Sequence, residues 1–118
     1  MKRFKVYGMG AALVDTEIRV ADSELAQLGV EKGLMTLVDR GRRGELLQAL
    51  DGHLVEASHA SGGSAGNSII AAALFGGDCY MSCRVADDAD GRIYLDDLAS
   101  AGVSYPGPAP SDVPTGKC

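Results

Sequence analysis

The segment Gly62-Gly63-Ser64-Ala65-Gly66-Asn67 constrains this chain most, because it joins a glycine-rich turn directly to an apolar helical pattern. Two adjacent glycines let a backbone come close to a ligand, and the free N–H groups of a helix start suit hydroxyl or phosphate oxygens. Asn67 can donate and accept hydrogen bonds, as a sugar hydroxyl requires. The alternative is a glycine turn with an Asn cap, and the residues alone favour neither.

The residues from Ser68 to Phe75 are small or apolar and are followed by Gly76-Gly77. This run predicts a helix that is buried nearly all round and ends at the glycines. Around it, strand and helix patterns alternate, which is typical of a parallel α/β sheet. The expected core elements are strands over 4–7 and 78–83 and helices over 23–28, 39–50 and 87–101.

Other segments indicate a second, more exposed sheet. Apolar and polar residues alternate in the second half of 11–20 and again over 53–59, as in half-exposed strands. The apolar run over 34–38 is a further extended candidate. Four prolines between 106 and 114 make the last connection extended and linker-like. We therefore expect one α/β core with a small additional sheet.

Charge and cysteine content exclude several classes of partner. Carboxylates outnumber Lys and Arg by 16 to 11, and only Arg40, Arg42 and Arg43 cluster, so we expect no nucleic-acid partner. Gly8, Gly10 and other breaks interrupt the first apolar stretch, so we expect neither a signal peptide nor a membrane partner. Three cysteines without a CxxC pair fit reduced thiols and a cytoplasmic location.

The sequence does not match three known motifs for nucleotides or calcium. Gly8-Met9-Gly10 follows a strand, but a dinucleotide-binding fingerprint needs a small residue where Leu13 stands. No Gly-Lys-Ser/Thr of a P-loop occurs, since Gly116-Lys117 is followed by Cys118. Asp88-Ala89-Asp90-Gly91 hints at a calcium loop, yet Ala86 stands where its first carboxylate belongs. Asp87 and Asp88 are better explained as N-terminal helix residues.

Metal-ligating residue types do not converge either. His53 and His59 would share one face of the predicted strand, but no carboxylate or cysteine completes a site. Cys79 and Cys83 are four residues apart on another strand, too far to ligate one ion without help, and we expect them in the core. We therefore predict no metal-binding residue in this chain.

Taken together, three motifs resemble the PfkB (ribokinase-like) kinases over the whole chain. They are the segment from Gly8 to Asp15, the glycine-rich segment from Gly62 to Asn67, and Arg-Val-Ala-Asp-Asp-x-x-Gly from Arg84 to Gly91. Ala101-Gly102-Val103 and the segment from Pro114 to Cys118 stand where the family has a helix end and a return strand. The opening segment is most similar to adenosine kinases.

The resemblance implies a ribokinase-like three-layer α/β/α core with a small β-sheet lid, incomplete in this chain. Residues 1–118 would be the N-terminal portion of the kinase domain. The lid strands would lie within about 11–20, 34–38 and 53–59 and from 115, and the remainder would be core. The expected function is the substrate-binding part of an ATP-dependent kinase that phosphorylates the hydroxymethyl group of an adenosine-like nucleoside or a sugar.

By motif position, the resemblance assigns Asp15 to ribose or sugar hydroxyls, with Gly62, Gly63, Ser64 and Asn67 completing the hydroxyl contacts. Elementary chemistry agrees, because a carboxylate accepts two vicinal hydroxyls and is costly to leave unpaired. The alternative is an Asp at a strand-to-strand bend. The residues implied to line the apolar side of the pocket are Leu13, Met35 and Leu37.

ATP and Mg²⁺ are the implied cofactors, but the family's Gly-Ala-Gly-Asp segment with the catalytic base has no counterpart before Cys118. We expect no catalytic residue in this chain, which should be inactive alone. Self-association, or pairing with the missing C-terminal half, is the expected macromolecular contact. The alternative function is a non-catalytic sugar- or nucleoside-binding or assembly module that is complete at Cys118.

Overall fold

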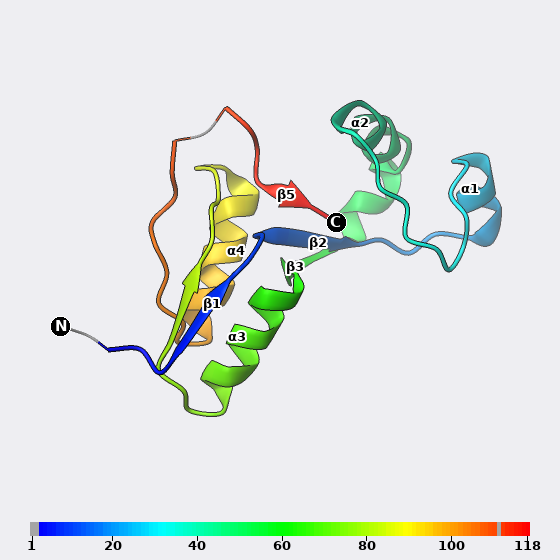
Figure 1. Cartoon of the computed structure of the whole chain (residues 1–118). Coiled ribbons are helices and arrows are strands. Elements are labelled where there is room, and N and C mark those ends of the chain that lie inside the picture. The colour runs from blue at the N-terminus through cyan, green and yellow to red at the C-terminus, as the bar shows by residue number, and fades with distance from the viewer. Residues whose placement is uncertain (1–2, 111) are drawn as a thin grey trace. The chain divides into compact units, whose positions relative to one another are not determined.

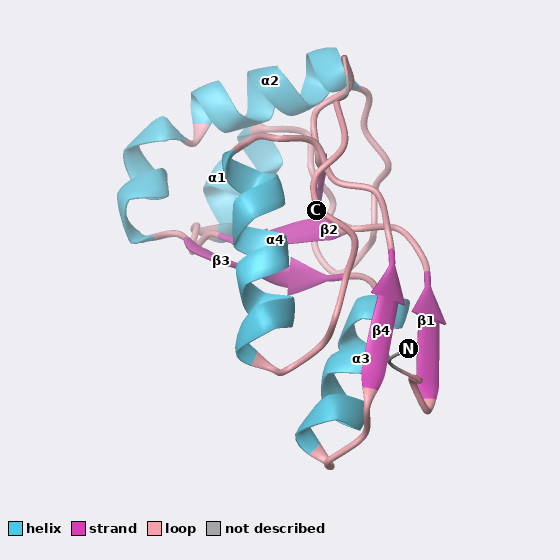
Figure 2. Cartoon of the chain, turned by 90° about the vertical axis from the view of Figure 1, so that its left-hand side faces the viewer, coloured by secondary structure: helices cyan, strands magenta, loops and turns pink. Residues whose placement is uncertain are grey.

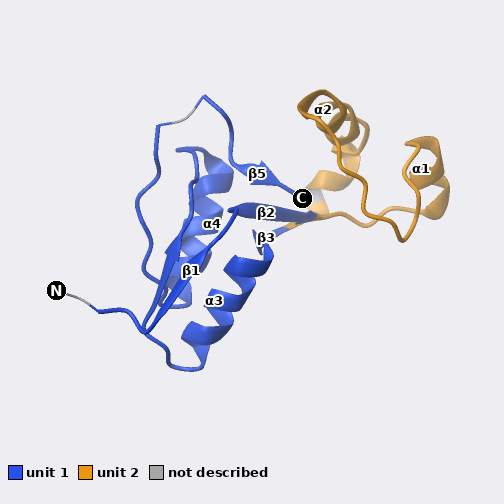
Figure 3. Ribbon diagram, in the orientation of Figure 1, with its two compact units in different colours: residues 1–16, 59–118 blue, residues 17–58 orange. Residues whose placement is uncertain are grey.

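The computed structural model describes residues 3–110 and 112–118, which form two compact units (Figure 3). Unit 1 comprises Met1–Thr16 and His59–Cys118, and unit 2 comprises Glu17–Ser58. The glycine-rich segment and Asp15 both belong to unit 1, so the candidate site is built within that unit.

A parallel strand pair forms the centre of unit 1. β1 (Val6–Met9) pairs with β4 (Cys79–Ser82), and Gly8 lies opposite Met81 in the register. After β4 the chain forms a helix and returns beside the same strand, where Tyr80 and Ser104 make a parallel bridge. These pairings confirm the predicted parallel α/β arrangement.

Two helices complete this core. α3 (Ser64–Leu74) contacts both β1 and β4, as Figure 2 shows from the side, while α4 (Ala89–Ser100) contributes its apolar face. Gly76 and Gly102 adopt positive φ angles of 91° and 81° just after the two helices, as their predicted role as helix ends requires. The buried side chains of the core are Ala12, Val14, Ile69, Cys79, Met81, Val85, Tyr94, Leu95, Leu98 and Val103.

The second sheet of the chain has three strands in the order β3-β2-β5. They are β2 (Leu13–Glu17), β3 (Ser58–Gly62) and β5 (Gly116–Lys117), labelled in Figure 1. β5 runs parallel to β2, with Gly116 opposite Leu13 and Lys117 opposite Val14. The expected strands near residue 13 and after residue 115 therefore pair with each other.

Unit 2 contains α1 (Asp22–Gln27), α2 (Arg40–Ala49) and the short 3₁₀ helix η1 (Asp51–Glu56). No residue of α1 or α2 is buried. Asp39 caps α2, because its side chain accepts a hydrogen bond from the Arg42 amide at 2.7 Å. The predicted cap and helix are both confirmed.

Two predicted strands in this region are wrong. Residues 34–38 have no regular structure, and Leu34, Met35 and Leu37 are exposed, because no neighbouring strand among the described residues pairs with their backbone. Residues 51–56 form η1, so the strand expected over 53–59 begins only at Ser58. A few alternating apolar residues fit one helical turn as well as a short strand.

The helix expected over 68–75 is longer and less buried than predicted. It begins at Ser64, and its last turn leaves Leu74 and Phe75 exposed by 73% and 93%. Only one side of α3 faces the β1–β4 pair, so an apolar sequence on every side does not produce burial on every side. None of the helices within residues 3–110 and 112–118 is long and apolar enough to cross a membrane.

Candidate functional site

Six of the eight predicted site residues lie in unit 1. Leu13 and Asp15 are on β2, Gly62 ends β3, Gly63 is the N-cap of α3, and Ser64 and Asn67 lie in the first turns of that helix. Met35 and Leu37 belong to unit 2, where they are 86% and 91% exposed. The candidate site is therefore formed by β2, the end of β3 and the start of α3.

The closest approach in this site is between Asp15 and Gly62. A Cβ atom placed on Gly62 would collide with both carboxylate oxygens of Asp15, so the carboxylate lies directly against the glycine backbone. Gly62 is buried, whereas Asp15 is exposed. Only a residue without a side chain fits at position 62, and the carboxylate beside it remains accessible to a ligand.

Gly63 has a conformation that other residues rarely adopt. Its φ angle is 84°, and a Cβ there would lie 3.0 Å from the Ala11 carbonyl oxygen. As the N-cap of α3 it offers no side chain to cap the helix. The N–H groups of the first helical turn are therefore left for other acceptors, which oxygen atoms of a ligand can supply.

The structure contradicts the alternative in which Asn67 caps the helix. This residue is the fourth of α3, and its amide N–H donates to the Gly63 carbonyl at 3.0 Å as part of the regular helix. Ser64 and Asn67 are both exposed and three residues apart, so they share one face of the helix. Asn67 is thus in place for a side-chain contact, but it does not cap α3.

A glycine in β1 and another just after it allow α3 to pack closely on this part of the chain. A Cβ on Gly10 would lie 2.6 Å from the Ala65 Cβ, and one on Gly8 would lie 3.2 Å from Ile69 and from Met81. The Gly8-Met9-Gly10 motif therefore serves helix packing in this chain. The sequence could not assign this packing role, because Ala65, Ile69 and Met81, which pack against the two glycines, lie far along the chain.

Gly66 is packed against the Tyr94 hydroxyl of α4. A Cβ on Gly66 would lie 2.7 Å from the Tyr94 Oη. Tyr94 is fully buried, and its hydroxyl has no hydrogen-bond partner among the described residues. Burial raises the pKa of Tyr94 to about 12, because it disfavours the charged phenolate. This hydroxyl therefore stays protonated at neutral pH.

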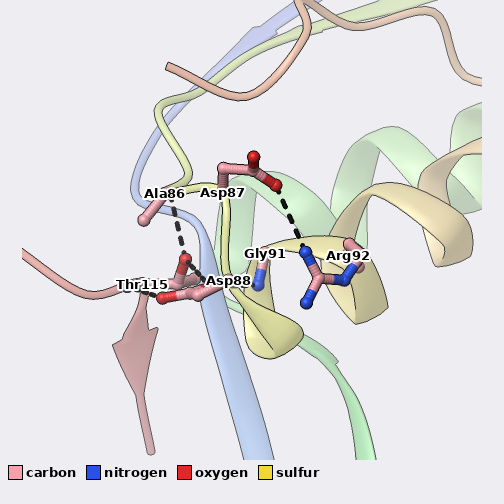
Figure 4. Close-up of polar contacts among 6 residues, drawn as sticks. All are labelled: Ala86, Asp87, Asp88, Gly91, Arg92 and Thr115. Atoms are coloured by element: carbon pink, nitrogen blue, oxygen red, sulfur yellow. Dashed lines mark hydrogen bonds and ion pairs between the residues drawn. The ribbon is translucent and has the colours of Figure 1, made fainter. Parts of the chain in front are cut away.

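A polar network joins the start of α4 to the return strand (Figure 4). Asp88 caps α4 by accepting from the Gly91 amide at 2.7 Å, and it also accepts from the Thr115 amide at 2.9 Å and the Thr115 hydroxyl at 2.7 Å. The buried Thr115 hydroxyl in turn accepts from the Ala86 amide at 3.1 Å. One carboxylate thus holds both the helix and the chain leading into β5.

The same network sets the ionisation of Asp88. Partial burial opposes its charge, but the hydrogen bonds from Thr115 and Gly91, together with the nearby Arg92, outweigh this effect. The pKa of the Asp88 carboxyl is therefore below its usual value. Nearby, Lys117 of β5 forms an ion pair with Asp90 at 3.2 Å, and both side chains are mostly buried.

The histidines and cysteines do not form a common site. His59 contacts the Thr16 hydroxyl at 3.2 Å, and His53 contacts Glu24 at 2.9 Å in unit 2. Cys79 is in the core as predicted, Cys83 is half-buried against it, and Cys118 is exposed. Within residues 3–110 and 112–118, no group of three or more His, Cys, Asp or Glu side chains is placed to hold a metal ion.

Solved kinase structures share this fold over nearly the whole chain. A probable sugar kinase from Rhizobium etli CFN 42 is 37% identical, with a TM-score of 0.80 over 99% of this chain and 34% of that one. An adenosine kinase from Sinorhizobium meliloti is 34% identical, with a TM-score of 0.73 over 98% of this chain and 35% of that one. No protein-family model and no curated protein matches the sequence.

More distant structures share the fold at lower identity. An adenosine kinase from Schistosoma mansoni, in complex with adenosine and AMP, is 16% identical, with a TM-score of 0.82 over 99% of this chain and 36% of that one. In each of these comparisons the chain spans about a third of the length of the protein it matches. The similarity therefore covers this chain but only part of the kinases.

Proposed function

We propose that this chain, which resembles the N-terminal portion of the PfkB (ribokinase-like) kinases and has their fold, is the substrate-binding part of such a kinase. The whole enzyme would transfer the γ-phosphoryl group of ATP to the hydroxymethyl group of a nucleoside or sugar. An adenosine-like nucleoside is the favoured substrate, since adenosine kinases are among the similar structures.

The position of Asp15 against the Gly62 backbone is the observation that carries this proposal. A carboxylate held there can accept hydrogen bonds from two vicinal hydroxyls of a ribose or sugar ring. Gly62 has no side chain, so the Asp15 carboxylate can lie against the backbone from which the ring hydroxyls would be held. The uncapped first turn of α3 offers N–H donors to the same ring oxygens.

The remaining residues would complete the substrate contacts. We assign further hydroxyl contacts to Ser64 and Asn67, whose exposed side chains share one face of α3. Leu13, half-buried on β2, would contact the apolar side of the substrate. On the family resemblance, we assign the base side also to Met35 and Leu37, whose apolar side chains are exposed in unit 2.

ATP and Mg²⁺ belong to the whole kinase in this proposal. By the family resemblance, the segments that hold ATP and Mg²⁺ belong to the part of the kinase that this chain does not match, so we assign no residue of this chain to either. We likewise assign no catalytic base. Because the chain spans about a third of the similar kinases, we expect it to bind substrate without transferring phosphate on its own.

Cellular location and partners follow from the same proposal. Free cysteines, one of them exposed, fit a reducing compartment, and we place the kinase in the cytoplasm. The exposed side chains of Tyr7, Met9, Leu74 and Phe75 form apolar surface that the rest of the kinase would cover. The same surface favours the second candidate, an assembly module whose role ends with binding another chain.

Calorimetric titration of adenosine into the 118-residue chain tests the substrate site. Asp15→Ala should weaken binding by about tenfold or more, the effect of losing a charge-assisted hydrogen bond. Glu17→Ala is the matched control, because Glu17 is an exposed carboxylate two residues along the same strand. Dideoxyadenosine, which lacks the vicinal hydroxyls, should bind weakly to all three proteins. Equal adenosine affinity of wild type and Asp15→Ala would exclude the proposed role of Asp15.

A further inference from the structure

Asp97 of α4 makes a contact that the core packing of this helix does not explain. Its Oδ2 atom accepts a hydrogen bond from the Ser61 amide at 2.7 Å, across 36 residues of sequence. Ser61 immediately precedes Gly62, the residue whose backbone lies against the Asp15 carboxylate. One peptide unit therefore separates the Asp97 contact from the closest approach in the candidate substrate site.

We propose that Asp97 is a positioning residue that fixes the turn at Gly62 and Gly63 and so sets the distance between this turn and Asp15. The inference rests on the proposed substrate-binding function and deepens it. Asp97 itself contacts the backbone next to the turn and not the substrate. Its carboxylate acts by fixing the direction of one backbone N–H group, that of Ser61.

The place of Asp97 in α4 supports a role outside the helix. It lies in the last turn of α4 (Ala89–Ser100), three residues before Ser100, where the helix dipole disfavours a negative charge. The helix is held to the core by Tyr94, Leu95 and Leu98, which are buried apolar neighbours of this position. The Asp97 carboxylate is thus not required for helix formation. Its contact is with the Ser61 amide, which would lose this hydrogen bond without it.

There is little free space around Gly62 and Gly63, so a contact that fixes their position affects the geometry of the site. The Gly62 backbone is already so near Asp15 that a single added carbon would collide with the carboxylate. The next residue, Gly63, lies against the Ala11 carbonyl oxygen. Loss of the Ser61 anchor would let the turn move, and a displacement of well under 1 Å changes hydrogen-bond geometry at a bound hydroxyl.

The carboxylate of Asp88, the N-cap of α4, makes a similar contact next to β5, which is the neighbour of β2 on its other side. Asp88 holds Thr115, and the next two residues pair with Leu13 and Val14, which directly precede Asp15. In the sheet order β3-β2-β5, the strand carrying Asp15 therefore has a neighbour fixed by α4 on each side. This arrangement is consistent with one helix setting the position of the site from both edges.

The test compares Asp97→Ala with Asp96→Ala in the full chain, since Asp96 is the adjacent, exposed carboxylate of the same helix. Amide hydrogen exchange should become faster at Ser61, Gly62 and Gly63 in Asp97→Ala only. Adenosine affinity should fall by about tenfold in Asp97→Ala. Asp97→Asn, which keeps an oxygen acceptor, should restore most of the affinity and of the exchange protection.

Two results would overturn the inference. The first is the same exchange at residues 61–63 in Asp97→Ala and Asp96→Ala. The second is an Asp97→Asn variant as impaired as Asp97→Ala, because the acceptor would then not matter. If wild type bound no adenosine, the proposed function would fail, whereas hydrogen exchange at residues 61–63 would still decide whether Asp97 fixes the turn.

Discussion

At the scale of single residues, glycines determine how closely the elements of unit 1 approach one another. Gly62 admits the Asp15 carboxylate, Gly10 admits Ala65, and Gly66 admits the Tyr94 hydroxyl. Each of these contacts would be blocked by one methyl group. Substitution of such a glycine therefore creates a clash with one specific neighbour, and a smaller side chain at the neighbour can remove that clash.

Gly66 and Tyr94 give a prediction for a coupled pair. Gly66→Ala should destabilise the chain by about 1–3 kcal/mol, because the new methyl group overpacks against the Tyr94 hydroxyl. Tyr94→Phe removes a buried hydroxyl that has no partner among the described residues, so it should be neutral or stabilising. In the double variant the methyl group has room, and alanine favours the helix by about 1 kcal/mol over glycine.

Urea unfolding of the two single variants and the double variant measures this coupling. The Gly66→Ala penalty should largely vanish in the Tyr94→Phe background. Strictly additive free energies of unfolding would contradict the contact between Gly66 and the hydroxyl as the source of the penalty.

The residues of the candidate site differ in how far the sequence predicts them. The glycine turn and Asp15 were identified from residue chemistry and family resemblance, and the structure brings Asp15 and Gly62 into contact. The sequence left open whether Asn67 caps the helix, and it does not, because the helix begins earlier, at Ser64. The contact of Asp97 with Ser61 could not be predicted, since no local pattern links residues 36 positions apart.

At the scale of elements, helix boundaries with local signals were predicted well. Asp39 and Asp88 cap α2 and α4, and Gly76 and Gly102 follow the ends of α3 and α4. The wrong predictions over 34–38 and 53–59 concern segments whose structure depends on a pairing partner. Short apolar runs do not specify such a partner, because strand pairing is a tertiary contact.

Asp88 yields a prediction about the element it holds. Asp88→Asn should still cap α4, because asparagine is a good N-cap. An amide has only one oxygen, so its NH₂ group must face either the Thr115 N–H or the pair formed by the Thr115 hydroxyl and the Gly91 amide. The hydrogen bonding on the side that the NH₂ group faces is lost, and this loss should lower the free energy of unfolding by about 1–3 kcal/mol at neutral pH.

The effect of Asp88→Asn should depend on pH. Because the folded-state pKa of Asp88 is lowered, its contribution is present above the unfolded-state value of about 3.9 and is lost as pH falls through the folded-state value. Urea unfolding at pH 7 and pH 3 should therefore show a smaller difference between variant and wild type at pH 3. Asp87→Asn, which affects only an exposed pair with Arg92, is the control. An equal difference at both pH values would contradict a role of the charged carboxylate.

At the scale of the whole molecule, the chain has a formed core and an exposed apolar surface. The parallel strands and their helices bury a continuous cluster, yet β1 pairs only with β4 among the described residues, and Tyr7 and Met9 remain 60% and 74% exposed. The similar kinases are about three times as long as this chain. We therefore expect the rest of a kinase to cover this surface, and pairing with a C-terminal half stays a prediction from the sequence.

The most direct measurement of the central claim is phosphoryl transfer by this chain joined to the part of the Rhizobium etli sugar kinase that lies outside the matched region. With ATP and Mg²⁺, the joined protein should phosphorylate adenosine or a sugar. Asp15→Ala should lower kcat/KM by about tenfold or more, and Glu17→Ala should not. A folded joined protein that binds ATP but phosphorylates neither nucleosides nor sugars would contradict the account.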